Sequence, residues 1–134
     1  FQIGNKNGTR GPLFRVAASR ARVMELVTAS LGAADDPATT AKAETAFLVG
    51  ILSFVHVLLG VDRKRALSGL TLPEDMRLAL SEHEGDLGRL LRLTECMDGG
   101  EFAELATIAE ELSVAPDALW AHQREAFDWV MRMI

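Results

Sequence analysis

Residues 46–60 read Ala-Phe-Leu-Val-Gly-Ile-Leu-Ser-Phe-Val-His-Val-Leu-Leu-Gly, and this stretch decides the fold class of the chain. Its apolar side chains point in every direction around a helix, and its length favours a helix over a buried strand. A helix that is apolar all round must be surrounded by protein. The stretch therefore predicts an all-apolar central helix over about residues 41–59, ended by Gly60.

Helical patterns lie on both sides of this segment. Residues 13–31 place their apolar side chains on one helical face, with Pro12 in the first turn and Gly32 as the C-cap. Residues 35–40 predict a polar connector. Further helices are expected to begin near residues 62, 73, 86, 102 and 116. No segment alternates strictly between apolar and polar residues, so we predict an all-α, compact bundle of about six to seven helices.

Size and charge exclude several functional classes. A chain of 134 residues, 49% hydrophobic and 25% charged, is long enough for one domain with a real core. Fourteen Lys and Arg against nineteen Asp and Glu give a formal charge of −5. This sign argues against broad nucleic-acid binding, and no helix combines a basic face with a clear recognition turn. We therefore expect no nucleic-acid partner.

The cysteine content and the ends of the chain bear on location. Cys96 is the only cysteine, so no internal disulfide can form, which fits a reducing cytoplasm. No signal-peptide pattern is present, and the apolar run 46–59 is shorter than the roughly 20 residues needed to span a bilayer. We expect a cytoplasmic protein without a membrane partner. A start at Phe1, on a stretch rich in Gly and Asn, predicts a fragment of a longer protein whose residues 1–11 form a loop.

Candidate metal and catalytic residues are sparse. The three histidines, His56, His83 and His122, are far apart in sequence and stand in no metal-binding motif. We expect His56 to be a hydrogen-bonded core residue; the other interpretation is a ligand. The chain has no phosphate-binding glycine motif and no nucleophile elbow. The sequence therefore predicts no catalytic residue, no metal and no cofactor.

Arg20 projects from the apolar face of the first predicted helix. We expect it to extend toward solvent at the edge of the core. The alternative is a buried ion pair, for example with Glu44 or another acidic residue nearby in space.

Two features are candidate interaction sites. Trp and Met are favoured at interfaces, and Trp129 is the more telling residue of the last helix because core packing explains Trp120 and Phe127 better. The second feature is a short basic run that starts a predicted helix, although a solvated helix start also accounts for it. The candidate interaction residues are Trp129, Arg63, Lys64 and Arg65.

Four segments in order resemble one known family. They are Pro12–Leu26, with its Arg-x-Arg and Met-Glu-Leu pattern, Ala46–Gly60, Ala66–Pro73 and Glu84–Leu91. Together they resemble the HDOD domain, a helical signalling relative of the HD-type metal phosphohydrolases, in the variety found at the C-terminus of EAL–HDOD proteins. The resemblance implies that residues 12–134 are the C-terminal part of a single HDOD-like domain and that residues 1–11 are a truncated N-terminal remnant.

The same resemblance implies that the metal centre has been lost. Catalytic HD hydrolases typically carry Gly-Leu-Leu-His-Asp-Ile in the central helix, where the His-Asp pair binds metal. Here Ser53 and Phe54 stand at those positions, and Val16 stands where an earlier helix usually supplies another His. These side chains offer no inner coordination sphere for a divalent ion. The resemblance predicts that Phe54 and Val16 fill the former site with core, and His56 departs from the acidic residue more common in the relatives.

By this resemblance the chain is expected to be a non-catalytic regulatory and protein-interaction module of a bacterial signal-transduction protein. In the parent it would be attached to an EAL-type domain that hydrolyses or senses cyclic di-GMP. Its expected partner is that upstream domain or another signalling protein, with a homodimer left open. The alternative is a degenerate HD-type metal-dependent phosphohydrolase with residual activity.

Overall fold

Helices account for nearly all of the regular structure in residues 2–133, the part of the chain that the computed structural model describes; side chains are described from Gly11 onward. The helices are α1 (Gln2–Leu31), α2 (Pro37–Leu52), α3 (Val55–Leu59), α4 (Arg63–Ser68), α5 (Glu74–Glu82), α6 (Gly85–Gly99), α7 (Phe102–Leu112) and α8 (Pro116–Met133). No strand occurs within residues 2–133. The predicted all-α class is confirmed.

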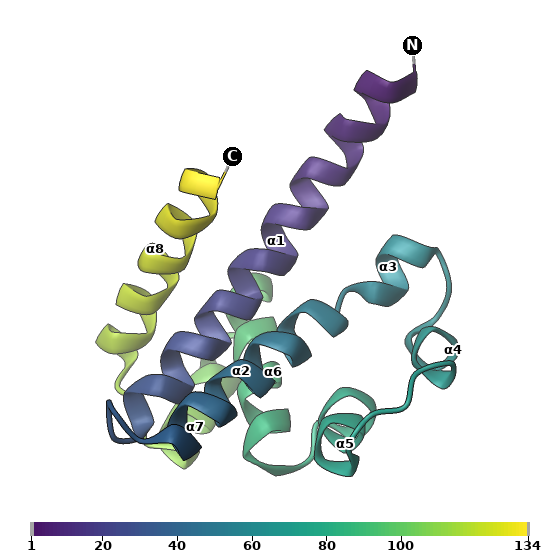
Figure 1. Cartoon of the computed structure of the whole chain (residues 1–134). Coiled ribbons are helices and arrows are strands. Elements are labelled where there is room, and N and C mark those ends of the chain that lie inside the picture. The colour runs from purple at the N-terminus through teal and green to yellow at the C-terminus, as the bar shows by residue number, and fades with distance from the viewer. Residues whose placement is uncertain (1, 134) are drawn as a thin grey trace.

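The antiparallel pair α1 and α2 forms the centre of the bundle (Figure 1). Two glycines allow this pair to pack closely: a Cβ on Gly50 would lie 2.4 Å from the Ala21 Cα, and one on Gly32 would lie 2.2 Å from the Thr39 Oγ1. Helix α8 packs against α1 on one side, while α5, α6 and α7 complete the other. The largest fully buried apolar side chains are Met24, Leu80, Leu91, Leu93 and Leu119.

The predicted central helix is interrupted, which raises the number of helices within residues 2–133 to eight. Helix α2 begins at Pro37, because the Asp36 side chain accepts a hydrogen bond from the Ala38 amide at 3.0 Å and caps the helix. It ends at Leu52, and Phe54 (φ −109°, ψ −2°) separates it from α3. The prediction of one helix over 41–59 is therefore wrong about where the helix begins and about its continuity. Residues 37–40 of the predicted polar connector over 35–40 are helical.

The second half of this segment is not surrounded by protein. Helix α3 contains no buried residue, and Val57, Leu58 and Leu59 are 42%, 54% and 62% exposed. Gly60 ends α3 with a left-handed φ of 72°, as predicted. The expectation that the whole apolar stretch lies inside the bundle is therefore wrong, because α3 packs against α4 and the end of α2 and not against α1.

The first eleven residues do not form the predicted loop. The backbone of residues 2–11 continues α1 beyond the rest of the bundle, and Pro12 lies inside the helix (Figure 1). Once a helix is nucleated, each added residue costs little, so weak helix formers such as Gly and Asn extend it. Phe1 lies outside the described residues.

One stretch of the described residues is long and apolar enough to cross a membrane. It is Pro37–Leu59, with 23 residues and a mean hydropathy of 1.6. This stretch is longer than the apolar run 46–59 because the helical region begins at Pro37. Length and composition alone make this stretch a candidate, and buried helices of soluble proteins meet the same criterion.

Candidate functional site

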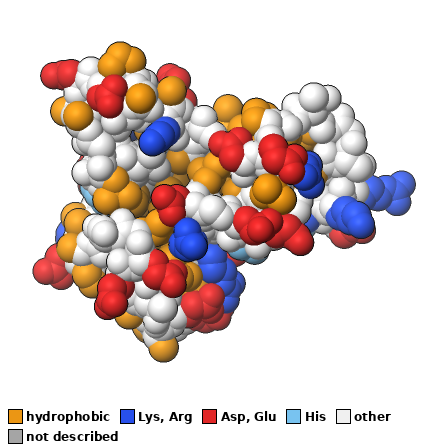
Figure 2. Space-filling view, turned by 90° about the horizontal axis from the view of Figure 1, so that it is seen from below, with side chains coloured by type: hydrophobic (Ala, Val, Ile, Leu, Met, Phe, Trp, Pro, Cys, Tyr) orange, Lys and Arg blue, Asp and Glu red, His pale blue; other side chains and the backbone are white. Residues whose placement is uncertain are grey.

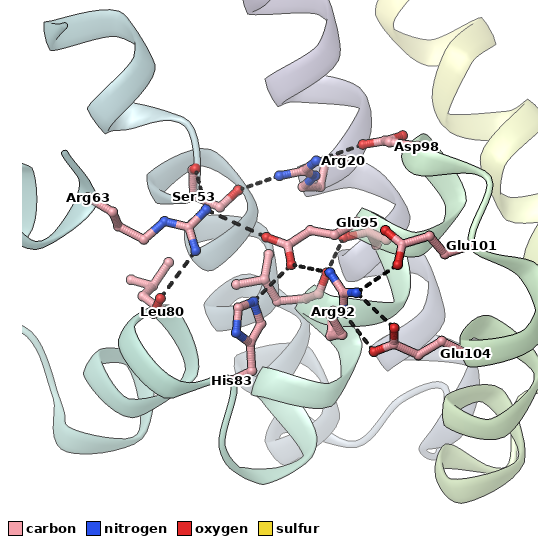
Figure 3. A network of polar contacts seen from close by, with 12 residues as sticks. Arg20, Ser53, Arg63, Leu80, His83, Arg92, Glu95, Asp98, Glu101 and Glu104 are labelled. Atoms are coloured by element: carbon pink, nitrogen blue, oxygen red, sulfur yellow. Dashed lines mark hydrogen bonds and ion pairs between the residues drawn. The ribbon is translucent and has the colours of Figure 1, made fainter. Parts of the chain in front are cut away.

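A network of polar side chains occupies the junction of α2 and α3 and extends across α6 to α7 (Figure 3). Ser53 lies at one end of it and is 1% exposed. Its Oγ donates to the Gly50 carbonyl at 2.7 Å and accepts from Arg20 Nη1 at 3.2 Å, while its carbonyl oxygen accepts from Arg63 Nη2 at 3.2 Å. Two guanidinium groups therefore converge on the residue that ends α2.

Arg20 is held by three neighbours. Its side chain is 10% exposed, and its Nη2 lies 2.7 Å from Asp98 Oδ2 at the C-terminal end of α6. The guanidinium carbon lies 4.1 Å from the centre of the Phe54 ring, a cation–π geometry. The expectation that Arg20 extends toward solvent is wrong. The alternative of an ion pair is confirmed in part: Arg20 pairs with a carboxylate of α6, but Asp98 is 45% exposed, so the pair is not fully buried.

Arg63 of α4 and Glu95 of α6 form an ion pair that connects these two helices. Arg63 Nη2 lies 3.5 Å from Glu95 Oε2, and Arg63 Nη1 donates to the Leu80 carbonyl at 3.3 Å. Glu95 Oε1 also lies 2.8 Å from His83 Nε2. His83 is placed for this contact by its left-handed backbone at the end of α5, with φ 55°. Glu95, 16% exposed, is therefore the centre of the network.

Arg92 closes the network on the side of α7. Its guanidinium donates to Glu104 at 2.8 Å and to Glu101 at 3.0 Å, and the hydrogen bonds with Glu104 raise its pKa and lower that of the Glu104 carboxyl. Among the described residues, Glu101, Glu104 and the buried Cys96 form a group whose ligand atoms lie within 4.8 Å of one another. Burial raises the pKa of the Cys96 thiol, which favours the protonated form. Arg92 already neutralises both carboxylates, so this donor set suits a guanidinium better than a metal ion.

The structure corrects the expectation that Val16 and Phe54 fill a former metal site with core. Val16 is 44% exposed and lines a small cleft of about 180 Å³ beside Phe127. Phe54 is half-buried beneath Arg20. Ser53 is therefore surrounded by the paired guanidinium groups of Arg20 and Arg63 and not by apolar side chains alone.

The candidate interaction residues divide into two groups. Trp129 is half-buried, with its ring centre 6.1 Å from that of Phe47 and 5.1 Å from the Arg22 guanidinium, so its visible contacts are internal. Its role in an interface stays a prediction. Phe127 is 58% exposed and Trp120 37% exposed, so the expectation that core packing explains both is wrong. Lys64 and Arg65 are exposed on α4, whereas Arg63 belongs to the network.

His56 lies beside the same junction and is half-buried on α3. Its Nδ1 is buried without a hydrogen-bond partner among the described residues, so the prediction of a hydrogen-bonded core histidine is wrong. Burial, followed by the positive charges of Arg63 and Arg20, holds the pKa of the imidazole below its ordinary value of 6.5.

This pKa shift predicts a pH dependence of stability. Because the folded state binds a proton on His56 less readily than the unfolded state, its contribution should be lost as the pH falls from about 6.5 through the lower folded-state pKa. We expect the Tm of the wild type to fall more between pH 7.5 and pH 5.5 than the Tm of His56→Asn. Thermal melts followed by circular dichroism measure this difference, with the exposed-site variant Arg15→Gln as the control. An equal fall in Tm between pH 7.5 and pH 5.5 for wild type and His56→Asn would contradict the lowered pKa of His56.

Sequence reasoning missed most of the network. Glu95 and Asp98 have partners on α4, α5 and α1, far away in the chain, so no local pattern identifies them. The available signal was the three-residue spacing of Arg92, Glu95 and Asp98, which places these charges along one side of the predicted fifth helix.

Comparison with known proteins gives one partial relative. The chain is 41% identical over 59 residues to the cyclic di-GMP phosphodiesterase CdgJ of Vibrio cholerae serotype O1. The match covers 44% of this chain and 14% of the relative. No protein-family model and no solved structure matches the chain.

Proposed function

We propose that the chain is a non-catalytic regulatory and interaction module of a bacterial cyclic di-GMP signalling protein, of the HDOD type. The observation that carries the proposal is the arrangement at Ser53, where the resemblance to HD hydrolases expects metal ligands. Arg20 and Arg63 donate hydrogen bonds to Ser53 there, and each is paired with a carboxylate of α6. Two fixed positive charges oppose the binding of a divalent cation at that position.

The similarity to a cyclic di-GMP phosphodiesterase supports the signalling part of the proposal. Exposed apolar side chains support the interaction part where they lie together, as Val57, Leu58 and Leu59 do on α3 and Val16 and Phe127 do at one cleft. Large apolar groups gathered on a surface mark contacts with other proteins. The exposed large side chains include Phe14, Val16, Leu48, Val57, Leu58, Leu59, Phe127 and Met131. The proposed partner is an EAL-type domain of the parent protein or another signalling protein, and the proposed location is the cytoplasm.

Metal loading and hydrolysis test the absence of catalysis. After incubation with Mn²⁺, Fe²⁺ or Zn²⁺ and desalting, we expect less than about one tenth of an ion per chain by elemental analysis, because the donor set is neutralised by arginines. We also expect no hydrolysis of cyclic di-GMP above the rate of a boiled sample, and retention of the chain on an immobilised EAL-type domain from the parent protein.

A control separates the proposal from a degenerate hydrolase. His56→Asn and His83→Asn remove the two histidines nearest Ser53 and Glu95, and His122→Asn, on α8, is the matched change elsewhere. Stoichiometric metal that is lost in either of the first two variants but kept in the third would overturn the proposal in favour of a metal-dependent phosphohydrolase.

A further inference from the structure

Residues 55–70, which contain α3 and α4, form an arm that stands away from the rest of the bundle (Figure 1). Helix α3 buries no side chain and α4 buries only Leu67. Helix α3 packs mainly against α4 and against the end of α2. The arm therefore gains little stability from the core, and its surface is free for another contact.

The arm carries apolar and positively charged groups side by side. Leu58 and Leu59, at 54% and 62% exposure, lie near its tip. Lys64 and Arg65 are exposed on α4 and have no ion pair within the described residues. Arg63 instead points inward and ties the arm to Ser53, Leu80 and Glu95. A fixed arm of this composition suits an apolar cleft whose edge is negatively charged.

The same molecule has a cleft lined by both polar and apolar side chains. It has a volume of about 650 Å³ and is lined by the C-terminal end of α1, the first half of α2, the start of α5, the start of α6 and the end of α7. Its apolar lining includes Leu31, Leu87, Leu90 and Leu112. This volume is within the range of clefts that hold a drug-sized ligand, and it accommodates the aliphatic side chains of a helix end.

The edge of this cleft is predominantly acidic. Asp75, Asp86 and Glu111 lie along it together with Lys42, and Arg89 pairs with Asp86 at 3.0 Å and with Glu111 at 3.8 Å. Asp75 has no ion pair within the described residues. Figure 2, which views the molecule from below, shows acidic side chains around apolar ones, with Lys and Arg side chains both among them and at one edge. Lys64 and Arg65 against Asp62 leave one net positive charge on the exposed side chains of the arm. Asp75, Asp86 and Glu111 against Lys42 and Arg89 leave one net negative charge at the cleft.

We propose that the arm of one copy of this chain docks into the cleft of a second copy, so that copies associate head to tail. No residue of the arm lines the cleft of its own chain. Leu58 and Leu59 would enter the apolar part of the neighbour's cleft. Lys64 and Arg65 would face Asp75, which has no ion pair in the described structure, and Asp86, which already pairs with Arg89. The inference rests on the proposed function only in taking the chain to be a protein-interaction module. Contacts of this kind join unlike surfaces and close into rings or continue as chains.

Sedimentation velocity over a range of protein concentrations tests the proposal on the chain itself. We expect the wild type to associate with rising concentration, and association to weaken at high salt because the charges are exposed. Lys64→Glu/Arg65→Glu should raise the dissociation constant at least about tenfold, as should Asp75→Lys/Asp86→Lys. An equimolar mixture of the two variants should associate again, because each then offers a surface of the charge that the other needs.

Matched variants and a second assay separate the outcomes. Arg124→Glu/Arg132→Glu makes the same change in net charge as the arm variant, on exposed positions of α8, and should associate like the wild type. Circular dichroism verifies that every variant is folded. A wild type that stays monomeric, or a mixture of the two variants that does not associate, overturns the proposal. Arm-dependent flotation of a monomeric chain with vesicles of phosphatidylglycerol and phosphatidylcholine overturns it in favour of a lipid contact. Loss of self-association alone leaves the proposed function intact if the metal, hydrolysis and EAL-domain assays give their expected results.

Discussion

Gly50→Ala is expected to lower the free energy of unfolding by about 3 kcal/mol, the upper part of the usual range for overpacking. A Cβ at this position would lie 2.4 Å from the Ala21 Cα and 2.9 Å from the Ala21 amide nitrogen. Both atoms belong to the backbone of α1, so no side-chain rotation relieves the clash, and α1 and α2 must separate. Alanine is the better helix former by about 1 kcal/mol. A loss of stability would therefore report the close approach of the helices and not a change in helix propensity.

Urea unfolding followed by circular dichroism at 222 nm measures this effect. The midpoint should fall by roughly 1–2 M, with little change in the slope. Gly69→Ala is the matched control, because a Cβ there meets nothing within 4 Å and its φ of −87° suits any residue. The control should change the free energy of unfolding by no more than about 0.5 kcal/mol. Equal midpoints for the two variants would show that α1 and α2 do not pack as described.

Glu95→Ala is expected to cost about 2 kcal/mol, because it removes the carboxylate shared by three cationic or basic side chains. His83 Nε2, Arg63 Nη2 and Arg92 Nη1 lie 2.8, 3.5 and 3.8 Å from its oxygens. Glu95 is only 16% exposed, so solvent screens these contacts weakly. Truncation leaves the partners close together without a counter-charge, which costs more than the loss of an isolated surface pair.

Two comparisons make this prediction specific. Glu95→Gln keeps the size and one acceptor oxygen and should lose less stability than Glu95→Ala. Glu110→Ala, at an exposed position of α7 without an ion pair in the described structure, should be nearly neutral. Hydrogen exchange by mass spectrometry should also be faster over residues 55–70 in Glu95→Ala, because Arg63 loses its carboxylate partner and keeps only the Ser53 and Leu80 carbonyls. If Glu95→Ala and Glu110→Ala unfold at the same urea concentration, the network does not stabilise the fold.

Local signals predicted the helices well where one residue sets a boundary. Asp62 caps α4 by accepting from the Arg65 amide at 2.8 Å, and Gly60 ends α3 with a left-handed φ of 72°. Such caps act over three or four residues, so the sequence shows them directly. Asp86 is an exception: it lies in the first turn of α6, and Glu84 is the N-cap.

The candidate site was far less predictable, because its contacts join distant parts of the chain. Arg20 and Asp98 are 78 positions apart, and nothing near either residue identifies the other. The break after Leu52 was also hidden, since the apolar pattern continues through it without change. Ser53 was singled out through the family resemblance, but its surroundings depend on which face of α1 meets α2.

The placement of the two tryptophans on α8 gives the protein separate fluorescent reporters. Trp129 lies against Phe47 of α2 and Arg22 of α1, whereas Trp120 lies near Phe102 of α7, with ring centres 6.2 Å apart. An indole that moves from a partly buried site into water emits at longer wavelength. With one tryptophan replaced by phenylalanine, the emission of the other follows one end of α8 alone. Detachment of α8 from the α1–α2 pair can thus be told apart from its detachment from α7 without any added label.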